Sequence, residues 1–393
     1  DLEEIKNKVN ESQSLEAISQ SRRKKDGIFY TPDYIVRYIV DNSLGAYLRE
    51  HEEKFKAEFG LKGNITDKTY EKRERQAYAK YQDFLQSVKV VDPACGSGAF
   101  LVYVFDYLLA ENKRVGDILG MSLFSTDEYV RDILRNNSYG VDLNEESVEI
   151  TKLSLWLKTA QKGKKLTTLD ENIKCGNSLV DDARIAGDKF FDWQEQFADV
   201  FKNGGFDVVV GNPPYVKLQN INSGDVKQTQ YFEQSYEVAK GRFDLYVLFI
   251  EKALSIIRED GIASYILPHK FLGSEFGNAT RKYLANKNAV KRIVHFGSHR
   301  VFADASTYTC VIELSKNNKE LLFAQVNPLD IQSSIAFSGI EYKNLGEGTW
   351  QLVSSSSAGV ISKVTSQENK IKDIFSKVSR GVVTGADSIF IVK

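Results

Sequence analysis

The stretch that decides the fold is residues 206–215, which read Phe206-Asp207-Val208-Val209-Val210-Gly211-Asn212-Pro213-Pro214-Tyr215. It opens with a short, β-branched, apolar run, typical of a strand buried on both faces of a parallel sheet. The two prolines end the strand, because neither has an N–H for the ladder and each fixes its own φ. Asn212 and Tyr215 therefore lie at the carboxyl end of a strand, where open α/β sheets bind ligands.

The turn from Asn212 to Tyr215 has the groups needed to hold a flat, amine-bearing ring. An exocyclic amine on such a ring is a poor nucleophile, because its lone pair is delocalised into the ring. Acceptors aimed at both N–H bonds, here the Asn212 side-chain oxygen and the Pro213 carbonyl, would free that lone pair by electrostatic preorganisation. The Tyr215 ring would stack on the plane of the group. The alternative is a rigid turn that only shapes a loop, since Asn-Pro is an ordinary turn former.

A second segment predicts a nucleotide-type site. Residues 88–91 read as a buried strand, residues 92–98 as a turn of small residues, and residues 100–110 as an apolar helix, which together make a βα unit. Gly96 and Gly98 let a ligand approach the backbone. The turn has neither the three-glycine dinucleotide fingerprint nor the Gly-Lys-Ser/Thr of a phosphate loop. The acid at the strand end, Asp92, favours a cationic or amine-bearing ligand.

Two further strand ends carry polar residues. Residues 139–144 place Asp142 just before a helix expected over residues 145–160, where a carboxylate can bind a ribose diol. The alternative for Asp142 is a helix N-cap. Residues 173–179 form a short strand followed by Asn177, which is able to meet the edge of an adenine ring.

In this order, the four segments resemble the gamma-class DNA methyltransferases that methylate adenine N6 with S-adenosylmethionine. The resemblance is to the methyltransferase portion of type IIG restriction–modification enzymes. It runs from residues 27–32, which read GIFYTP, to about Leu314, with a weaker tail beyond. It implies an α/β fold with a doubly wound, mostly parallel, seven-stranded Rossmann-like sheet, whose last hairpin adds an antiparallel strand.

The resemblance also implies a cofactor site for S-adenosylmethionine. Thr31 would contact the carboxylate of the cofactor, Asp92 to Gly98 its methionine part, Asp142 its ribose hydroxyls, and Asn177 with Leu179 its adenine. Many relatives carry an acid where Asn177 stands, but an Asn oxygen can also accept a hydrogen bond. The full set of cofactor-binding residues expected is Tyr30, Thr31, Pro32, Asp92, Pro93, Ala94, Cys95, Gly96, Ser97, Gly98, Phe100, Asp142, Leu143, Asn177, Ser178 and Leu179.

The catalytic residues implied by the resemblance are Asn212, Pro213, Pro214, Tyr215 and Phe302. Tyr215 and Phe302 would lie on opposite faces of a target adenine, which must leave the DNA stack to reach them. Transfer would leave S-adenosylhomocysteine and needs no metal.

Composition sets limits on this reading. The chain has 393 residues with three cysteines, four histidines and a net charge of −1. The few, widely separated cysteines and the lack of a signal peptide or long apolar span favour a reducing cytoplasm, and no cysteine–histidine spacing indicates a metal site. The near-zero charge is unusual for a protein that binds phosphates. Basic residues are therefore concentrated on one face, or the phosphate contacts lie in another part of the protein.

We expect three regions along the chain. Residues 1–86 would form a helical region that includes the Tyr-Thr-Pro segment, residues 87–315 the catalytic domain, and residues 316–393 a linker with the truncated start of a target-recognition domain. The resemblance implies double-stranded DNA as partner, with an upstream nuclease domain and a downstream recognition domain in the same polypeptide. Two alternatives stay open: a methyltransferase for protein glutamine or an RNA amine, and a cofactor-binding regulatory segment of a nuclease.

Overall fold

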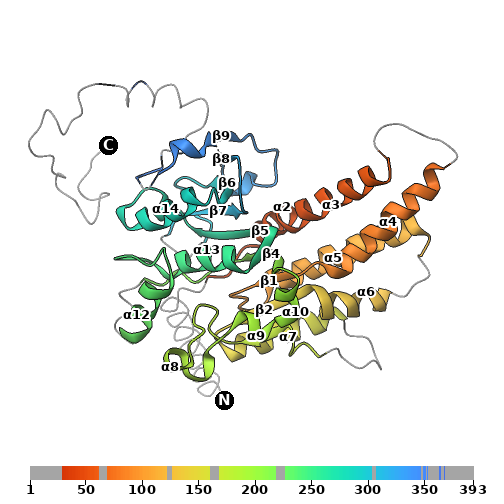
Figure 1. Cartoon of the computed structure of the whole chain (residues 1–393), viewed down its shortest axis with the longest axis horizontal. Coiled ribbons are helices and arrows are strands. Elements are labelled where there is room, and N and C mark those ends of the chain that lie inside the picture. The colour runs from red at the N-terminus through yellow and green to blue at the C-terminus, as the bar shows by residue number, and fades with distance from the viewer. Residues whose placement is uncertain are drawn as a thin grey trace, which may run out of the picture. The chain divides into compact units, whose positions relative to one another are not determined.

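The computed structural model describes residues 29–61, 69–121, 126–159, 168–217, 226–302, 307–346 and 348–350, together with Leu352, Lys363 and Gln367. The chain divides into two compact units, Asp1–Leu352 and Val353–Lys393. The first unit contains the sheet, its helices and all the predicted site residues, and it is the unit described below (Figure 1).

The strands of the described residues form one nine-stranded sheet in the order β3-β2-β1-β4-β5-β7-β6-β8-β9. Strands β1 to β5 pair in parallel, and β7 runs antiparallel between β5 and β6. The strand bounds are β1 (Val90–Asp92), β2 (Ser138–Asp142), β3 (Ile173–Cys175), β4 (Phe206–Gly211), β5 (Ile257–Pro268), β6 (Val290–His295), β7 (Thr309–Leu314), β8 (Glu320–Gln325) and β9 (Ser338–Glu341).

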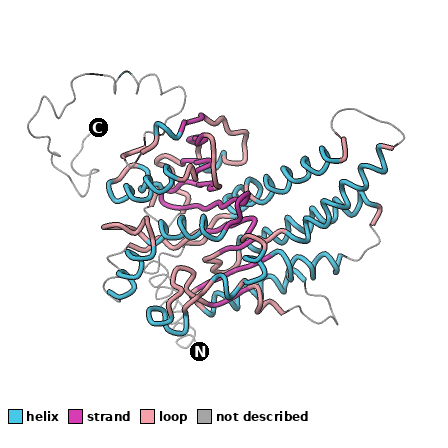
Figure 2. Tube along the Cα trace, in the orientation of Figure 1, coloured by secondary structure: helices cyan, strands magenta, loops and turns pink. Residues whose placement is uncertain are grey.

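Helices cover both faces of this sheet (Figures 1 and 2). The α-helices are α2 (Asp33–Asn42), α3 (Leu44–Glu58), α4 (Tyr70–Ser87), α5 (Ala99–Leu119), α6 (Thr126–Asp132), α7 (Glu145–Thr159), α8 (Ala183–Ala186), α9 (Trp193–Gln196), α10 (Ala198–Lys202), α12 (Val226–Ser235), α13 (Leu245–Ile256) and α14 (Asn278–Asn286). Short 3-10 or π turns are η1 (Ile133–Asn137), η2 (Gly187–Lys189), η3 (His269–Leu272), η4 (Glu275–Gly277), η5 (Pro328–Asp330) and η6 (Tyr342–Asn344).

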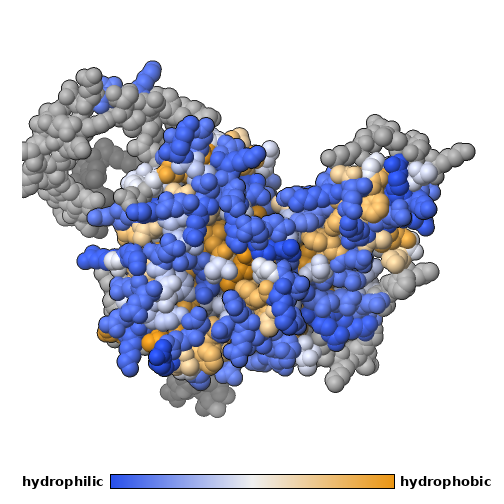
Figure 3. Space-filling view, viewed as in Figure 1, coloured by the Kyte–Doolittle hydropathy of each residue, from blue (hydrophilic) through white to orange (hydrophobic). Residues whose placement is uncertain are grey.

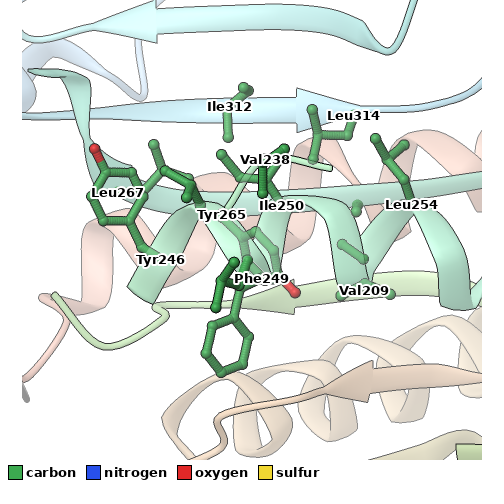
Figure 4. Close-up of a cluster of buried hydrophobic side chains, with 14 of the residues drawn as sticks. Val209, Val238, Tyr246, Phe249, Ile250, Leu254, Tyr265, Leu267, Ile312 and Leu314 are labelled. Carbon is green, nitrogen blue, oxygen red and sulfur yellow. The ribbon is translucent and has the colours of Figure 1, made fainter. Parts of the chain in front are cut away.

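Strand β4 shows why the sheet is doubly wound. Every residue of β4 is buried, because its side chains alternate between two apolar cores. Val208 and Val210 belong to the core under α2 and α5, whereas Val209 belongs to the core under α13. Figure 4 shows Val209 gathered with Ile250 and Leu254 of α13. The predicted doubly wound, mostly parallel fold is therefore confirmed.

The sheet continues beyond the expected end of the catalytic domain. Strands β1 to β7 correspond in number to the seven strands expected. The antiparallel β7 is the strand that the last hairpin was expected to add. Residues 320–341, expected to belong to a linker, add two more: β8 pairs in parallel with β6, and β9 pairs antiparallel with β8. The compact unit then extends to Leu352.

The segment after β9 is tied to the turn that follows β5. The Trp350 amide donates to the Leu272 carbonyl at 3.1 Å. The Arg281 side chain is 1% exposed and donates to the Gly348 carbonyl at 2.7 Å and to the Ser274 carbonyl at 2.8 Å. These bonds make the end of the unit part of its packed body.

The surface of the unit is mostly polar on the face drawn in Figure 3. Among the described residues, none of the helices combines the length and the apolar character that crossing a membrane requires.

A buried carboxylate joins the amino ends of the central strands. Asp207 is 3% exposed. It accepts hydrogen bonds from the Tyr47 hydroxyl at 2.7 Å, the Lys89 amide at 2.6 Å and Arg258 Nη1 at 3.0 Å. Because these donors come from α3, the start of β1 and β5, this one side chain connects a helix to neighbouring strands.

We expect Asp207→Asn to lower the free energy of unfolding by about 2–4 kcal/mol. The amide would turn an NH₂ group toward groups that are themselves donors, and it would lose the negative charge that pairs with Arg258. Urea unfolding followed by circular dichroism measures the change. Asp199→Asn is the control, because Asp199 forms an exposed pair with Lys202 and exposed pairs contribute little. Equal stability of Asp207→Asn and wild type would contradict this account.

Candidate active site

The four predicted polar segments meet at one edge of the sheet. Strands β3, β2, β1 and β4 are adjacent and parallel, so their carboxyl ends share this edge. The structure thereby brings Asp92, Asp142, Asn177 and Asn212 to neighbouring positions, although they are spread over more than a hundred residues of sequence.

Hydrogen bonds fix the turn after β1, and the space beside the Gly96 backbone is free of atoms of the described residues. The Gly96 amide donates to Asp142 Oδ2 at 2.8 Å, and Thr151 Oγ1 donates to the Gly96 carbonyl at 2.8 Å. Gly96 has φ of +54°, and a Cβ placed there would meet no atom within 4 Å. Gly98 has φ of +84°, and its missing Cβ would lie 3.0 Å from the Thr151 side chain. The turn is therefore a backbone cradle that leaves room for a ligand.

Asp92 lies beneath this turn and beside β4. Its side chain is 1% exposed, and its Oδ1 accepts from the Ala94 amide at 3.0 Å. A Cβ on Gly211 would come within 2.6 Å of Asp92 Oδ1. Burial raises the pKa of Asp92 to about 8, with a further rise from Asp142 and an opposing contribution from the Ala94 amide.

Asp142 is positioned by backbone amides. Its Oδ1 accepts from the Asn144 amide at 2.9 Å, and its Oδ2 is bound by the Gly96 amide. Burial raises the pKa of Asp142, and both amides oppose this rise. The next residue, Leu143, is 57% exposed, which offers an apolar surface beside the carboxylate. Within the described residues, no group of three or more His, Cys, Asp or Glu side chains could hold a metal ion.

The loop after β3 is braced against the turn after β1. The Ser178 hydroxyl donates to the Pro93 carbonyl at 2.6 Å, and Asn177 Oδ1 accepts from the Leu179 amide at 3.1 Å. Leu179 is 3% exposed. These hydrogen bonds of the Ser178 hydroxyl and the Asn177 side chain are internal to this edge, which gives both residues a role in shaping it.

Some predicted cofactor residues support the site from behind. Cys95 and Phe100 are 5% and 4% exposed and belong to the core under the turn, and the Pro32 carbonyl accepts from the Ile35 amide at the start of α2. The Tyr30 side chain is 70% exposed and lines an open cavity of about 740 Å³ with Arg37, Tyr103 and others. The structure does not bring Tyr30 to the group around Asn212.

Asn212 has a fixed amide and an unused oxygen. Its Nδ2 donates to the Phe29 carbonyl at 3.0 Å and to Thr31 Oγ1 at 3.1 Å. These two acceptors determine which end of the amide carries the nitrogen. Its Oδ1 is buried, and no donor among the described residues lies within hydrogen-bond range of it. A buried acceptor without a partner calls for an explanation, and a hydrogen-bond donor on a ligand would supply one at this strand end.

Three aromatic rings adjoin this amide. The Tyr215 hydroxyl donates to the Ile266 carbonyl at 3.2 Å, and burial raises the pKa of Tyr215 well above its usual value, so the phenol stays neutral. The Tyr215 and Phe302 ring centroids lie 6.1 Å apart with planes at 71°. The rings are thus brought together as predicted, but in an edge contact and not as two parallel faces.

Phe29 completes this group, and the sequence analysis did not single it out. Its ring centroid lies 5.4 Å from that of Tyr215 and 5.6 Å from that of Phe302. The sequence feature that could have indicated Phe29 is its position two residues before Thr31. The segment that supplies a hydroxyl to Asn212 also supplies an aromatic ring.

Comparison with curated proteins gives relatives whose similarity extends over most of the chain. The chain is 31% identical over 335 residues to the type II restriction enzyme and methyltransferase RM.Eco57I of Escherichia coli, with 78% of this chain and 33% of that protein covered. It is 25% identical to the type II methyltransferase M.BstVI of Geobacillus stearothermophilus, with 78% and 55% covered. It is 24% identical to the adenine-specific methyltransferase PglX of Streptomyces coelicolor, with 66% and 20% covered. The chain thus spans between a fifth and just over half of these relatives.

Solved structures share the fold. The DrdV–DNA complex superposes with a TM-score of 0.58 at 18% identity, covering 86% of this chain and 32% of that one. The type IIL restriction-modification enzyme MmeI in complex with DNA gives 0.54 at 16% identity, covering 79% and 40%. At these identities the likeness concerns the fold alone.

The last comparison concerns the region that holds most of the site. Residues 136–302 match the model of the Eco57I restriction-modification methylase. They include Asp142, the loop after β3, the turn from Asn212 to Tyr215, and Phe302. By this match, residues 136–302 are similar to the Eco57I restriction-modification methylase family.

Proposed function

We propose that this chain transfers a methyl group from S-adenosylmethionine to N6 of an adenine flipped out of double-stranded DNA. The observation that carries the proposal is the buried, unpartnered Oδ1 of Asn212, fixed beside Tyr215 and next to the strand that ends in Asp92. The relatives support it, because several are named methyltransferases and one is named adenine-specific.

The residues at the sheet edge suit the proposed cofactor. When bound, S-adenosylmethionine supplies an electrophilic methyl group on a sulfonium. The open space at Gly96 admits its amino-acid part close to the backbone. Its positive charges would lower the raised pKa of Asp92 and would then be stabilised by the ionised carboxylate. Asp142 can still accept from ribose hydroxyls, because each carboxylate oxygen has a second lone pair. Leu143 would lie against the adenine, and Thr31, whose oxygen accepts from Asn212, keeps its own proton to donate to a carboxylate.

Asn212 would make the target amine reactive. Its Oδ1 would accept one amine N–H and the Pro213 carbonyl the other, which favours a pyramidal nitrogen with an available lone pair. The bonds from Nδ2 to Phe29 and Thr31 hold the amide in this orientation before the base arrives, so no reorganisation is needed. A general base is not required, because the nitrogen can lose its proton after methylation.

The aromatic group would hold the ring of the base. Tyr215 is fixed by its bond to Ile266 and would stack on one face, with Phe302 on the other. Because Phe29 now contacts both rings, a base that enters between them displaces it. Flipping costs a few kcal/mol, and the stacking and the hydrogen bonds to Asn212 and Pro213 would offset that cost.

The proposed partners are double-stranded DNA and further domains of a type II restriction–modification enzyme. Support comes from RM.Eco57I, whose name combines restriction enzyme and methyltransferase and of which this chain covers a third. We propose that a nuclease lies upstream and a target-recognition domain downstream. The net charge of −1 agrees with phosphate contacts made largely by such other parts. The protein would act in the cytoplasm.

We expect Asn212→Ala to lower methyl transfer at least about 10²–10³-fold while cofactor binding is kept, because the variant loses an acceptor for the developing charge. The assay incubates the chain and radiolabelled S-adenosylmethionine with duplex DNA, RNA or protein, and calorimetry measures cofactor affinity. Wild type should label DNA at adenine.

The control for this experiment is Asn203→Ala, since Asn203 bonds a main-chain carbonyl at the opposite edge of the sheet and should not affect transfer. Full incorporation by Asn212→Ala would remove Asn212 from the mechanism. Incorporation of the label into RNA or protein but not into DNA would show that DNA is not the substrate.

We expect Asp92→Asn to stabilise the cofactor-free protein increasingly as pH rises. Because the pKa of Asp92 is raised from 3.8 to about 8 in the folded state, the stability contributed by its protonated form is complete below pH 3.8 and lost as pH rises through 8. The Asn variant has no proton to lose there. Its Tm should exceed that of wild type by more at pH 8.5 than at pH 6, while its affinity for S-adenosylmethionine falls about tenfold or more. A Tm difference that is independent of pH would contradict this role of Asp92.

A further inference from the structure

We propose that Tyr236, assisted by Tyr231, positions the cofactor-binding loop and couples cofactor binding to DNA binding. These tyrosines lie on the segment that follows the catalytic turn, and their hydroxyls bind the loop after β3. The inference rests on the proposed methyl transfer, because it assigns the two ligands to that site.

The segment that carries the tyrosines begins and ends beside the catalytic turn. The Leu245 amide donates to the Val216 carbonyl at 2.8 Å, and Lys217 forms an isolated antiparallel bridge with Asp244. Val216 directly follows Tyr215. The two ends of residues 217–244 are therefore held together next to the residues that would bind the flipped base.

From this position the segment reaches the other ligand site. The Tyr236 hydroxyl donates to the Leu179 carbonyl at 2.8 Å, and the Tyr231 hydroxyl donates to Asp181 Oδ1 at 2.6 Å. Tyr236 is 5% exposed, so its bond to Leu179 is shielded from water. Losing such a hydroxyl leaves a buried carbonyl without its donor.

Two neighbouring carbonyls of this loop are bound by residues at the start of α9 and just before it. Trp193 Nε1 donates to the Ser178 carbonyl at 2.9 Å, and the Phe191 amide donates to the Val180 carbonyl at 2.8 Å. Leu179 lies between these two and takes its bond from Tyr236. The loop is thus held between the body of the fold and the segment after the catalytic turn.

Tyr236 is itself held firmly enough to transmit a displacement. Glu251 of α13 accepts from the amides of Glu237 and Val238, at 3.1 and 3.0 Å, and the Tyr236 ring packs against Phe232 of α12 with centroids 6.1 Å apart. A shift of the segment on DNA binding would therefore move the Leu179 carbonyl. Because coupling between two sites is reciprocal, cofactor binding would favour the DNA-bound position equally.

The test measures the affinity of the full chain for S-adenosylhomocysteine by calorimetry, alone and with a duplex that wild type methylates. The product is used as the probe because it prevents turnover. DNA should tighten binding to wild type. Tyr236→Phe should weaken binding about 5- to 30-fold and reduce the effect of DNA toward none. Tyr231→Phe, which is nearer the surface, should act in the same direction and serves if Tyr236→Phe does not fold.

Tyr342→Phe is the matched control. The Tyr342 hydroxyl also bonds main-chain groups, those of Val290, but at the amino end of β6. The Tyr342→Phe variant should therefore leave both affinities unchanged. An unchanged affinity of Tyr236→Phe, or an unchanged effect of DNA on it, would overturn the inference. If wild type itself does not bind S-adenosylhomocysteine, the proposed function fails instead.

Discussion

The contact of Asp92 with the backbone of Gly211 is the constraint on which the site depends. Strands β1 and β4 pair in parallel, and Gly211 has no side chain that would push the carboxylate away. Only with this close approach do the acid below the glycine turn and the amide at the end of β4 share one small region. A group bound above Asp92 and a group bound at Asn212 are then neighbours, so a transfer between them needs alignment rather than movement.

The amino-terminal segment completes this region from far away in the chain. The Phe29 carbonyl and the Thr31 hydroxyl fix the Asn212 amide across more than 180 residues of sequence. The same short segment thereby orients the amide and contributes a ring. Strand pairing does not determine the position of this segment, because the segment precedes α2 and is held at the site by these contacts.

Much of the fold could be predicted from the sequence, because a largely apolar, β-branched run such as residues 206–210 indicates a buried strand. The shared edge of Asp92, Asp142, Asn177 and Asn212 follows from parallel pairing alone. What could not be predicted depends on packing in three dimensions. The tilt of Tyr215 against Phe302, the insertion of Phe29 and the outward turn of Tyr30 leave no periodic pattern. Residues 316–341 were expected to form a linker because polar residues and turns separate their short strand-like runs, and the sequence does not show that β8 pairs with β6 or that β9 forms the edge of the sheet.

The ties between the turn after β5 and the end of the unit bear on how such proteins exchange parts during evolution. Arg281 and Trp350 bind Gly348 and Leu272, and β8 and β9 belong to the same sheet as the site. A swap of downstream regions with a junction near residue 316 would cut strands away from the methylase core. A junction after Leu352 would leave all strands of the described residues and both anchors in place, so the sheet would survive an exchange made at that point.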